Sequence, residues 1–287
     1  MKRILYWLAV LMLLVGCSAQ RGTATIPPEN SAVVIAILDT GISSTAIDRE
    51  RLLEGYNYVT NSEDTEDRIN HGTAAASIIV GCESAGITGL APEVLLLPLV
   101  VTDKVDGKVT GVTPKVLAQA IYDAVNIYGA DIINVSLGIK KDVDAVRKAV
   151  EYAHKKGVLI ISAVGNDGED GAFYYPAAYD IVLGVGSHNE DGEVSEFSHQ
   201  NGSADLLAPG EDIWMASRNG AVYGAKGTSY AAACVSAAAA LLLTEKPKMA
   251  PEQVQQALYT NAMDIGSPGW DMQSGWGILK LTAPQLQ

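Results

Sequence analysis

The stretch VVIAILDTG, residues 33–41, decides the fold class of this chain. Its six apolar residues, 33–38, run without interruption into Asp39. Apolar side chains on both faces are typical of a strand in a parallel sheet that is covered on both sides. Four further runs predict strands of the same kind, at residues 94–101, 131–137, 158–164 and 181–185.

Amphipathic segments alternate with these strands. The clearest spans residues 113–128, where Thr113 can cap a helix, Pro114 fits its first turn and Gly129 ends it. Alternating strands and helices predict a layered α/β domain, which we expect over residues 32–287. The remaining predicted helices cover residues 71–80, 142–156, 228–243 and 251–260.

Composition excludes several classes of protein. Among 287 residues, 48% are hydrophobic and 18% are charged, a balance opposite to that of a disordered chain. Twenty basic and thirty-three acidic residues give a net charge of −13, so nucleic acid and anionic lipid surfaces are poor partners. Three cysteines make no disulfide framework.

The first seventeen residues have the pattern of an export signal. Lys2 and Arg3 precede an apolar run at residues 4–15, which is shorter than the ~20 residues that span a bilayer. The sequence LVGC at residues 14–17 resembles the bacterial lipoprotein signal, which implies cleavage before Cys17 and its lipidation. An uncleaved anchor and a stray cysteine are the two alternatives.

Cleavage at this point has consequences for charge and location. It removes two basic residues and no acid, so the net charge changes from −13 to −15. Residues 18–31 are small and polar and predict a tether. We therefore expect an extracytoplasmic protein of the cell envelope, lipid-anchored to a bacterial membrane through Cys17.

Polar residues follow two of the predicted strands, at the edge of the sheet where reactive groups gather. Asp39 ends the first strand, and a buried acid is costly unless it is paired, although an aspartate before Thr-Gly is also common in turns. Asn166 follows residues 158–164 and is an uncharged donor, although asparagine before Asp-Gly is also a frequent turn residue.

Two further candidates begin predicted helices. His71 precedes small residues that let its helix approach other backbones, and the positive helix end favours a neutral imidazole able to act as a base. Ser229 begins an alanine-rich helix, where its hydroxyl can react and its N–H can meet an oxyanion. A surface histidine and a helix-capping serine are the alternatives.

The tripeptide Asp39-Thr40-Gly41 also occurs in aspartic proteases, whose mechanism needs two carboxylates that share a proton. This chain has one such tripeptide and much predicted helix, although a dimer could supply a second carboxylate. That alternative predicts sensitivity to pepstatin and indifference to the loss of Ser229.

The order Asp39, His71, Ser229 with wide spacing is the order of the subtilisin triad. Over residues 31–281 the chain resembles the subtilisin-like serine proteases, which implies a three-layer αβα fold with a mainly parallel central sheet. Six segments carry the resemblance: residues 33–41, 70–73, 136–138, 175–177, 197–210 and 227–231.

The resemblance implies a serine endopeptidase that hydrolyses peptide bonds. Ser229 is then the nucleophile, His71 the general base and acid, and Asp39 the group that holds the imidazole in its useful tautomer. Asn166 and the Ser229 amide would hold the oxyanion. The chemistry requires no cofactor and no metal.

A peptide substrate is expected to bind by strand addition, between residues 136–138 and a segment near residues 107–111. The first pocket is expected between residues 136–139 and residues 163–166, with the bulky Tyr174 at its base, where it favours small substrate side chains. The residues expected to bind substrate are Ser136, Leu137, Gly138, Ala163, Gly165 and Tyr174.

The chain departs from the family pattern at three places, but no departure removes a reacting atom. Tyr230 replaces the usual Met after the serine, Ala233 the usual Pro, and Ala74 a second His. Asp48 aligns with an acid that binds calcium in many relatives, so it is a candidate ligand of a structural calcium ion. Cys82 and Cys234 are expected to be buried thiols.

Two functions remain to be distinguished. The first is a monomeric, membrane-tethered endopeptidase whose partners are a polypeptide substrate and the membrane, without nucleic acid. The second is a non-catalytic, peptide-binding lipoprotein with the same fold. The joint presence of Asp39, His71, Ser229 and Asn166 favours the first, because a binding module needs no such set.

Overall fold

The computed structural model describes residues 32–169 and 171–280; the predicted signal peptide, Cys17 and the tether lie outside them. A seven-stranded sheet forms the centre, in the order β11-β10-β9-β8-β1-β5-β2, and all its neighbouring strands are parallel. Its strands are β1 (Val34–Asp39), β2 (Tyr56–Asn57), β5 (Leu95–Val100), β8 (Ile132–Val135), β9 (Leu159–Ala163), β10 (Leu183–His188) and β11 (Leu206–Pro209).

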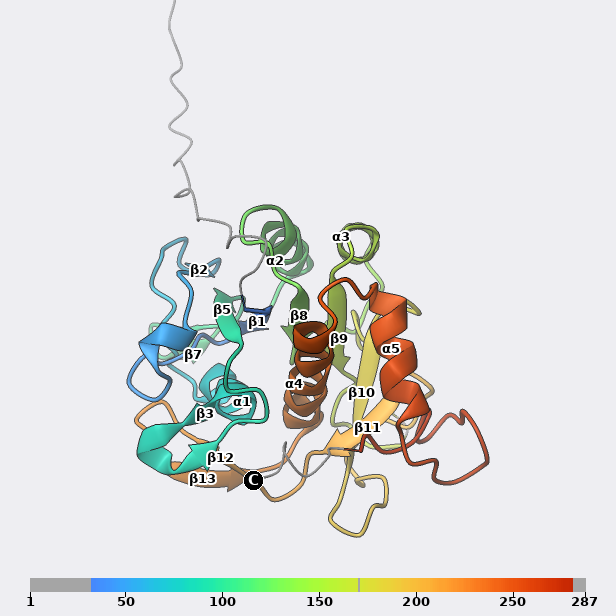
Figure 1. Ribbon diagram of the computed structural model, residues 1–287. Helices are drawn as coiled ribbons and strands as arrows, with labels where there is room; N and C mark the ends of the chain where they lie inside the picture. The colour runs from blue at the N-terminus through green and yellow to red at the C-terminus, as the bar shows by residue number, and fades with distance from the viewer. Residues whose placement is uncertain (1–31, 170, 281–287) are drawn as a thin grey trace, which may run out of the picture.

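Helices cover both faces of this sheet (Figure 1). They are α1 (His71–Val80), α2 (Pro114–Asn126), α3 (Asp144–Lys155), α4 (Thr228–Glu245) and α5 (Pro251–Thr260). In the central strand β1, Ile35 and Ile37 pack in the core with α1, α4 and α5, whereas Val34 and Leu38 pack in the core with α2 and α3. The predicted three-layer α/β fold is therefore confirmed.

Three small hairpins and two 3₁₀ turns complete the described chain. The hairpins pair β3 (Gly81–Cys82) with β4 (Ile87–Thr88), β6 (Lys104–Val105) with β7 (Lys108–Val109), and β12 (Ile213–Ala216) with β13 (Val222–Ala225). The 3₁₀ turns are Arg49–Arg51 and Glu83–Ala85.

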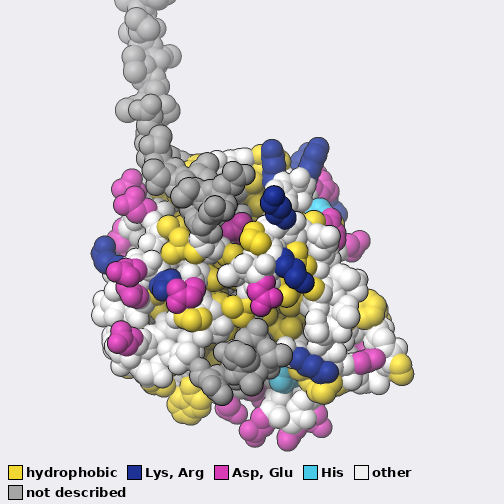
Figure 2. Space-filling model, in the orientation of Figure 1, with side chains coloured by type: hydrophobic (Ala, Val, Ile, Leu, Met, Phe, Trp, Pro, Cys, Tyr) yellow, Lys and Arg dark blue, Asp and Glu magenta, His cyan; other side chains and the backbone are white. Residues whose placement is uncertain are grey.

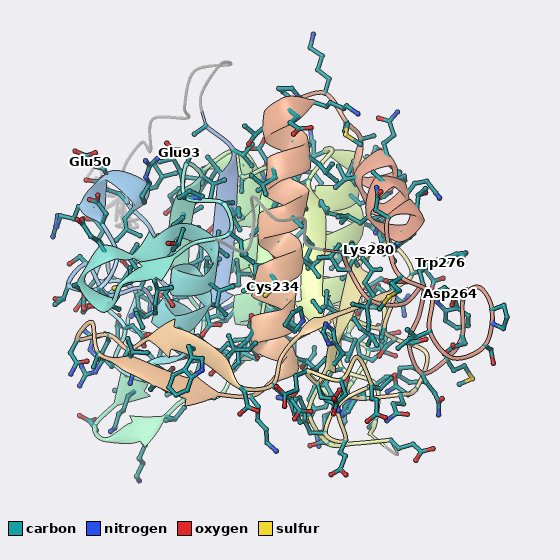
Figure 3. All side chains as sticks on the ribbon, turned by 60° about the horizontal axis from the view of Figure 1, so that its bottom comes forward. Glu50, Glu93, Cys234, Asp264, Trp276 and Lys280 are labelled. Carbon is teal, nitrogen blue, oxygen red and sulfur yellow. The ribbon has the colours of Figure 1, made fainter. Side chains whose placement is uncertain are left out.

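The helix α4 crosses the centre of the molecule in front of the strands, with Cys234 midway along it (Figure 3). It is apolar on all sides, as expected for a helix surrounded by protein. Among the described residues it alone is long and apolar enough to cross a membrane, but 78% of that window is buried in the protein. The helix α4 is therefore a core helix that packs against the sheet.

The predicted elements agree with the structure. Each of the five predicted strands and five predicted helices has a counterpart, with ends that differ by a few residues. The Thr113 hydroxyl accepts a hydrogen bond from the Val116 N–H at 3.3 Å, which confirms the predicted cap of α2. Cys82 and Cys234 are buried and free, also as predicted, and burial raises the pKa of the Cys234 thiol to about 12.

The strand order indicates where a site can form. The chain passes from β1 to β5 on one side, and then returns over β1 to β8 on the other. Ligands of open parallel sheets bind at such a switch point, beyond the carboxyl ends of the strands. Asp39 is the last residue of β1 and lies at this point.

The charge of the described surface is dispersed. On the face drawn in Figure 2, acidic side chains lie at the left, right and lower edges, with basic side chains interspersed among them. This distribution agrees with the acidic balance of the whole sequence.

Candidate active site

Asp39 and His71 are in direct contact. The His71 Nδ1 lies 2.7 Å from Oδ1 and 2.9 Å from Oδ2 of Asp39, whose side chain is fully buried. A carboxylate only accepts hydrogen bonds, so Nδ1 carries the proton and Nε2 is left with a free lone pair. This is the tautomer in which an imidazole can take a proton from a neighbour.

The surroundings of His71 tune its basicity. Burial lowers the pKa of the imidazole, but the charge of Asp39, their hydrogen bond and the charge of Asp67 outweigh it and raise the pKa above its ordinary value of 6.5. About a third of the His71 side chain is exposed, so one side of the ring faces solvent. His71 is therefore a strengthened base that solvent can reach.

Asp67 is a buried carboxylate that sequence reasoning missed. It accepts hydrogen bonds from the Thr40 hydroxyl at 2.9 Å and from the Thr73 hydroxyl at 2.7 Å. It also accepts from three backbone N–H groups near the start of α1, those of Ile69, Asn70 and Thr73. An acid four residues before a helix-opening histidine was the available signal, since carboxylates stabilise helix N-termini.

Ser229 lies in the first turn of α4 and is 6% exposed. In this structure its hydroxyl donates to the Ser136 carbonyl at 3.0 Å, and the Ser136 hydroxyl donates to the Ser229 carbonyl at 3.2 Å. Ser229 is therefore not bonded to His71 in this structure. It forms two hydrogen bonds with Ser136, which belongs to the segment predicted to bind substrate. Rotation about the Cα–Cβ bond of Ser229 is needed to direct Oγ toward His71.

The side chain of Asn166 is oriented by Thr228. Its Oδ1 accepts from both the N–H and the hydroxyl of Thr228, each at 2.9 Å. Two donors on one atom identify that atom as the amide oxygen and leave Nδ2 as a free donor. Nδ2 lies 3.5 Å from the place that a Cβ on Gly227 would occupy, so it faces the turn that leads into Ser229.

A buried polar chain connects α4 to the substrate segment. The Ser236 hydroxyl donates to Asn134 Oδ1 at 3.0 Å, and Asn134 Nδ2 donates to the Ser136 hydroxyl at 2.9 Å. Asn134 lies inside β8, and its side chain is fully buried. Sequence reasoning missed it, because the apolar pattern of the strand gives no sign of its partners.

The predicted pocket residues lie around Tyr174. Ile139, the last residue of one segment expected to flank the pocket, exchanges two backbone hydrogen bonds of 2.9 Å with Tyr175. A Cβ on Gly138 would lie 3.1 Å from Tyr174 Cβ, and a Cβ on Gly165 would lie 2.9 Å from Tyr174 Cδ2. The tyrosine therefore lies between the two segments expected to flank the pocket, residues 136–139 and 163–166. Leu137 is half-buried, and Ala163 is buried at the end of β9.

Behind the pocket lies His199, another residue that sequence reasoning missed. Its ring centroid is 5.4 Å from that of Tyr174, and its Nε2 lies 3.8 Å from Asp167 Oδ2. Burial lowers the pKa of His199, which the charge of Asp167 only partly offsets. A neutral His199 thus packs as a core residue that supports Tyr174.

The opposite predicted substrate segment, residues 107–111, includes the turn and second strand of the β6–β7 hairpin. Gly107 adopts φ +77°, a conformation that suits a tight turn. Lys104, Val105, Lys108 and Val109 are exposed, so both strands of the hairpin can be reached by a partner.

Asp48, the expected calcium ligand, lies at the start of a 3₁₀ turn. Its Oδ1 accepts from the Glu50 N–H at 3.0 Å and caps the first 3₁₀ turn. Within residues 32–169 and 171–280, no group of three or more His, Cys, Asp or Glu side chains is arranged to hold a metal ion. Calcium also takes backbone and amide carbonyl oxygens as ligands, so the calcium site expected at Asp48 stays a prediction.

Comparison with known proteins identifies the class. Residues 30–277 match the profile of the Subtilase family. The chain is 34% identical over 275 residues to the Major intracellular serine protease of Bacillus subtilis (strain 168), covering 88% of this chain and 82% of that protein. It is 32% identical over 252 residues to the Minor extracellular protease Epr of the same organism, covering 88% of this chain but 38% of that longer protein.

Comparison with solved structures gives the same class of protein. The crystal structure of a cold adapted subtilisin-like serine proteinase superposes with a TM-score of 0.76 and 28% identity, covering 91% of this chain and 92% of that one. The fold and the site thus define a serine peptidase built on a parallel α/β sheet. The chain belongs to the subtilase family.

Proposed function

We propose that Ser229, His71 and Asp39 form the catalytic triad of a serine endopeptidase. The observation that carries this proposal is the pair of short contacts between Asp39 and His71 Nδ1, which leave Nε2 free. An aspartic dyad is not favoured, because Asp39 pairs with an imidazole rather than with a second carboxylate. A non-catalytic peptide-binding protein would gain nothing from this tautomer.

The reaction would begin when Ser229 turns from the Ser136 carbonyl toward His71. Nε2 takes the hydroxyl proton as Oγ bonds to the peptide carbonyl carbon, and it later gives that proton to the leaving amine. Asn166 Nδ2 and the Ser229 N–H donate to the oxyanion. In subtilisin itself, loss of one such donor costs about 10²–10³ in kcat. Water then hydrolyses the acyl-enzyme by the same proton transfers.

The test is labelling with a fluorophosphonate probe together with hydrolysis of a peptide. Wild type should be labelled, and Ser229→Ala should lose both the label and the hydrolysis. Ser267→Ala is the control, since that serine is exposed in the loop that follows α5. Equal labelling of Ser229→Ala and wild type would refute the proposal.

We also propose that Tyr174 restricts the first substrate pocket to small side chains. The proposal is supported by the position of the ring between Gly138 and Gly165, where it fills space that a larger substrate side chain would need. The Tyr174 hydroxyl donates to Asp167 at 3.0 Å, which holds the ring there.

Peptides that differ only in the residue before the cleaved bond test this preference. Wild type should cleave after Ala faster than after Phe, and Tyr174→Gly should reverse the order. Phe173→Gly, a change at the exposed neighbouring residue, should leave the order as in wild type. Equal cleavage after Ala and Phe by wild type would count against the proposal.

For location, we infer from the sequence that the chain is exported, lipidated at Cys17 and held as a monomer on the outer face of a bacterial membrane. The support is the LVGC pattern at residues 14–17 after a short apolar run. Fractionation of cells should find wild type with the membrane and Cys17→Ala released from it. Cys82→Ala is the control and should stay bound; a membrane-bound Cys17→Ala would contradict the inference.

A further inference from the structure

Asp67 is a buried carboxylate in the loop that leads into α1, four residues before His71. It accepts hydrogen bonds from two hydroxyls, those of Thr40 and Thr73, and from three backbone N–H groups, those of Ile69, Asn70 and Thr73. A carboxyl group that only accepts is ionised, because a protonated one would also have to donate. Asp67 thus carries a negative charge inside the protein.

The adjacent Arg68 does not bond to this charge. Its guanidinium donates to Asp103 at 3.1 Å and to Asp64. Within the described chain, every hydrogen bond that Asp67 accepts comes from an uncharged donor. A buried charge without a bonded cation is costly, so a neighbouring group that can become positive is favoured to do so.

Thr40 connects Asp67 to the candidate triad. Its hydroxyl donates to Asp67 Oδ1 at 2.9 Å, and its N–H donates to Asp39 Oδ1 at 2.7 Å. The same oxygen of Asp39 lies 2.7 Å from His71 Nδ1. A single residue therefore holds both buried carboxylates, which fixes their positions relative to the imidazole.

Thr73 connects Asp67 to the first turn of α1, the helix that begins at His71. Its N–H and its hydroxyl donate to Asp67 Oδ2 at 3.0 Å and 2.7 Å. The Thr73 hydroxyl also accepts from the Ser43 N–H at 3.0 Å, which ties this turn to the loop after β1. Asp67 therefore helps to fix the turn that carries the imidazole.

Asn70, the residue before His71, also depends on Asp67. Its φ of +85° lies in the left-handed region, which costs a non-glycine residue energy unless the surroundings fix it. The Asn70 N–H donates to Asp67 Oδ1 at 2.9 Å. A change at Asn70 would rotate the start of α1, so this contact acts on the direction of the His71 side chain.

Two phenols also lie beside His71, and both are uncharged. The Tyr230 ring centroid lies 5.8 Å from that of the imidazole, and the Tyr223 hydroxyl donates to the Asn70 carbonyl at 3.0 Å. Burial raises the pKa of both phenols, so both are neutral where His71 titrates. Burial lowers the pKa of His71, and the charges of Asp39 and Asp67 raise it.

We propose that Asp67 is a positioning residue that fixes the turn carrying His71 and supplies a second buried negative charge to the imidazole; this rests on the triad proposed above. When His71 takes the proton of Ser229, the imidazolium that forms is stabilised by Asp39 and by Asp67. Charges that are already fixed in a dry site stabilise such a cation without a cost of rearrangement.

The first test is Asp67→Asn, which keeps the size of the side chain and removes its charge. We expect kcat and the rate of fluorophosphonate labelling to fall by about 10-fold with KM unchanged, because the change affects the base and not the substrate segments. The acid limb of kcat/KM against pH should move to lower pH, since loss of the Asp67 charge lowers the His71 pKa. A purely structural role would leave that limb in place.

Thr73→Val separates position from charge. It removes the hydroxyl that bonds to Asp67 and Ser43, and it leaves both carboxylates ionised. The variant should be labelled more slowly than wild type, by about 10-fold, while its acid limb stays where it is in wild type.

Asp271→Asn is the matched control. Asp271 lies in the loop after α5, and like Asp67 it holds a turn by accepting from backbone N–H groups and a hydroxyl, those of Ser267, Gln273 and Ser274. This variant should keep the kcat, the labelling rate and the acid limb of wild type. Melting temperatures show whether each variant is folded.

Different results overturn the two proposals. An acid limb that stays in place in a folded Asp67→Asn variant, or a Thr73→Val variant labelled as fast as wild type, would refute the role of Asp67 while the triad stands. If Asp67→Asn does not fold, the labelling rate of Thr73→Val decides. Wild type that neither cleaves peptides nor reacts with the probe at Ser229 would refute the triad itself.

Discussion

At the scale of single residues, the site depends on a charge placed where water cannot reach it. Asp39 is fully buried, and its Oδ1 accepts from His71 and from the Thr40 N–H at 2.7 Å. The carboxylate thus has donors but no basic partner other than the imidazole. Its charge favours a protonated His71, which is the form that appears as the reaction proceeds.

Substitution of Asp39 by Asn should expose this dependence. Asn carries no charge, so burial should then lower the His71 pKa and move the acid limb of the pH–rate profile to lower pH. In wild type that limb should lie above pH 6.5, because the base works only when it is deprotonated. The wrong tautomer should reduce kcat by about 10⁴-fold.

The check is kcat/KM of a small peptide between pH 5 and pH 9. Asp48→Asn, a change at an exposed carboxylate, should leave the profile as in wild type. An acid limb that stays in place in Asp39→Asn would show that Asp39 does not set the basicity of His71.

At the scale of elements, the end of β1 and the start of α1 are joined through Thr40. Its hydroxyl accepts from the Gly72 N–H at 2.9 Å and donates to Asp67 at 2.9 Å. A Cβ on Gly72 would lie 2.2 Å from the Gly41 carbonyl oxygen, so only glycine allows this approach. The distance between Asp39 and His71 is therefore set by a contact between two elements.

Thr40→Val should weaken the contact between β1 and α1, because valine has the shape of threonine but no hydroxyl. Two buried groups, the Gly72 N–H and an Asp67 oxygen, would lose a partner, and the free energy of unfolding should fall by about 1–3 kcal/mol. Urea unfolding measures the loss, and a peptide assay should show a lower kcat. Thr45→Val, at an exposed threonine, should change neither; equal stability of Thr40→Val and wild type would contradict the argument.

The long elements were predictable from sequence, and their connections were not. Continuous apolar runs indicate β1 and β9, and the Thr113-Pro114 start indicates α2, because burial and capping leave local patterns. The hairpin β6–β7 has exposed strands of two residues, so no apolar pattern marks it. Asp67 was missed because its local surroundings mark only a helix start, and its contact with Thr40 at the end of β1 forms only in the fold.

At the scale of the whole molecule, Asp205 links distant parts of the chain. Its carboxylate accepts from the Gly184 N–H at 2.8 Å, and its carbonyl accepts from the Trp276 N–H at 2.8 Å. Burial raises the pKa of Asp205 to about 6, the hydrogen bond from Gly184 lowers it, and the charge of Asp180 raises it further. The carboxyl group of Asp205 thus holds its proton more tightly in the native fold than in the unfolded chain.

This shift has a defined effect on stability. Because the native pKa is above the unfolded value of 3.8, the contribution is fully present below pH 3.8 and is lost as the pH rises through about 6. Asp205→Asn, which is always neutral, should be more stable than wild type at pH 7 by at most about 3 kcal/mol.

Urea unfolding at pH 4 and pH 7 checks this expectation, and the two proteins should differ less at pH 4. Asp212→Asn, a change at an exposed carboxylate, should have the same stability as wild type at both pH values. A variant less stable than wild type at pH 7 would show that the negative charge is favourable there.

The direction of β1 has one further consequence for the working enzyme. The described chain enters the sheet at Val34, whose N–H donates to Asp131 at 2.8 Å, and Asp39 lies at the far end of the same strand. Six residues of strand span about 20 Å. A tether on the N-terminal side of Val34 would therefore attach at the edge of the sheet opposite Asp39, and would leave the edge that carries the candidate triad unattached.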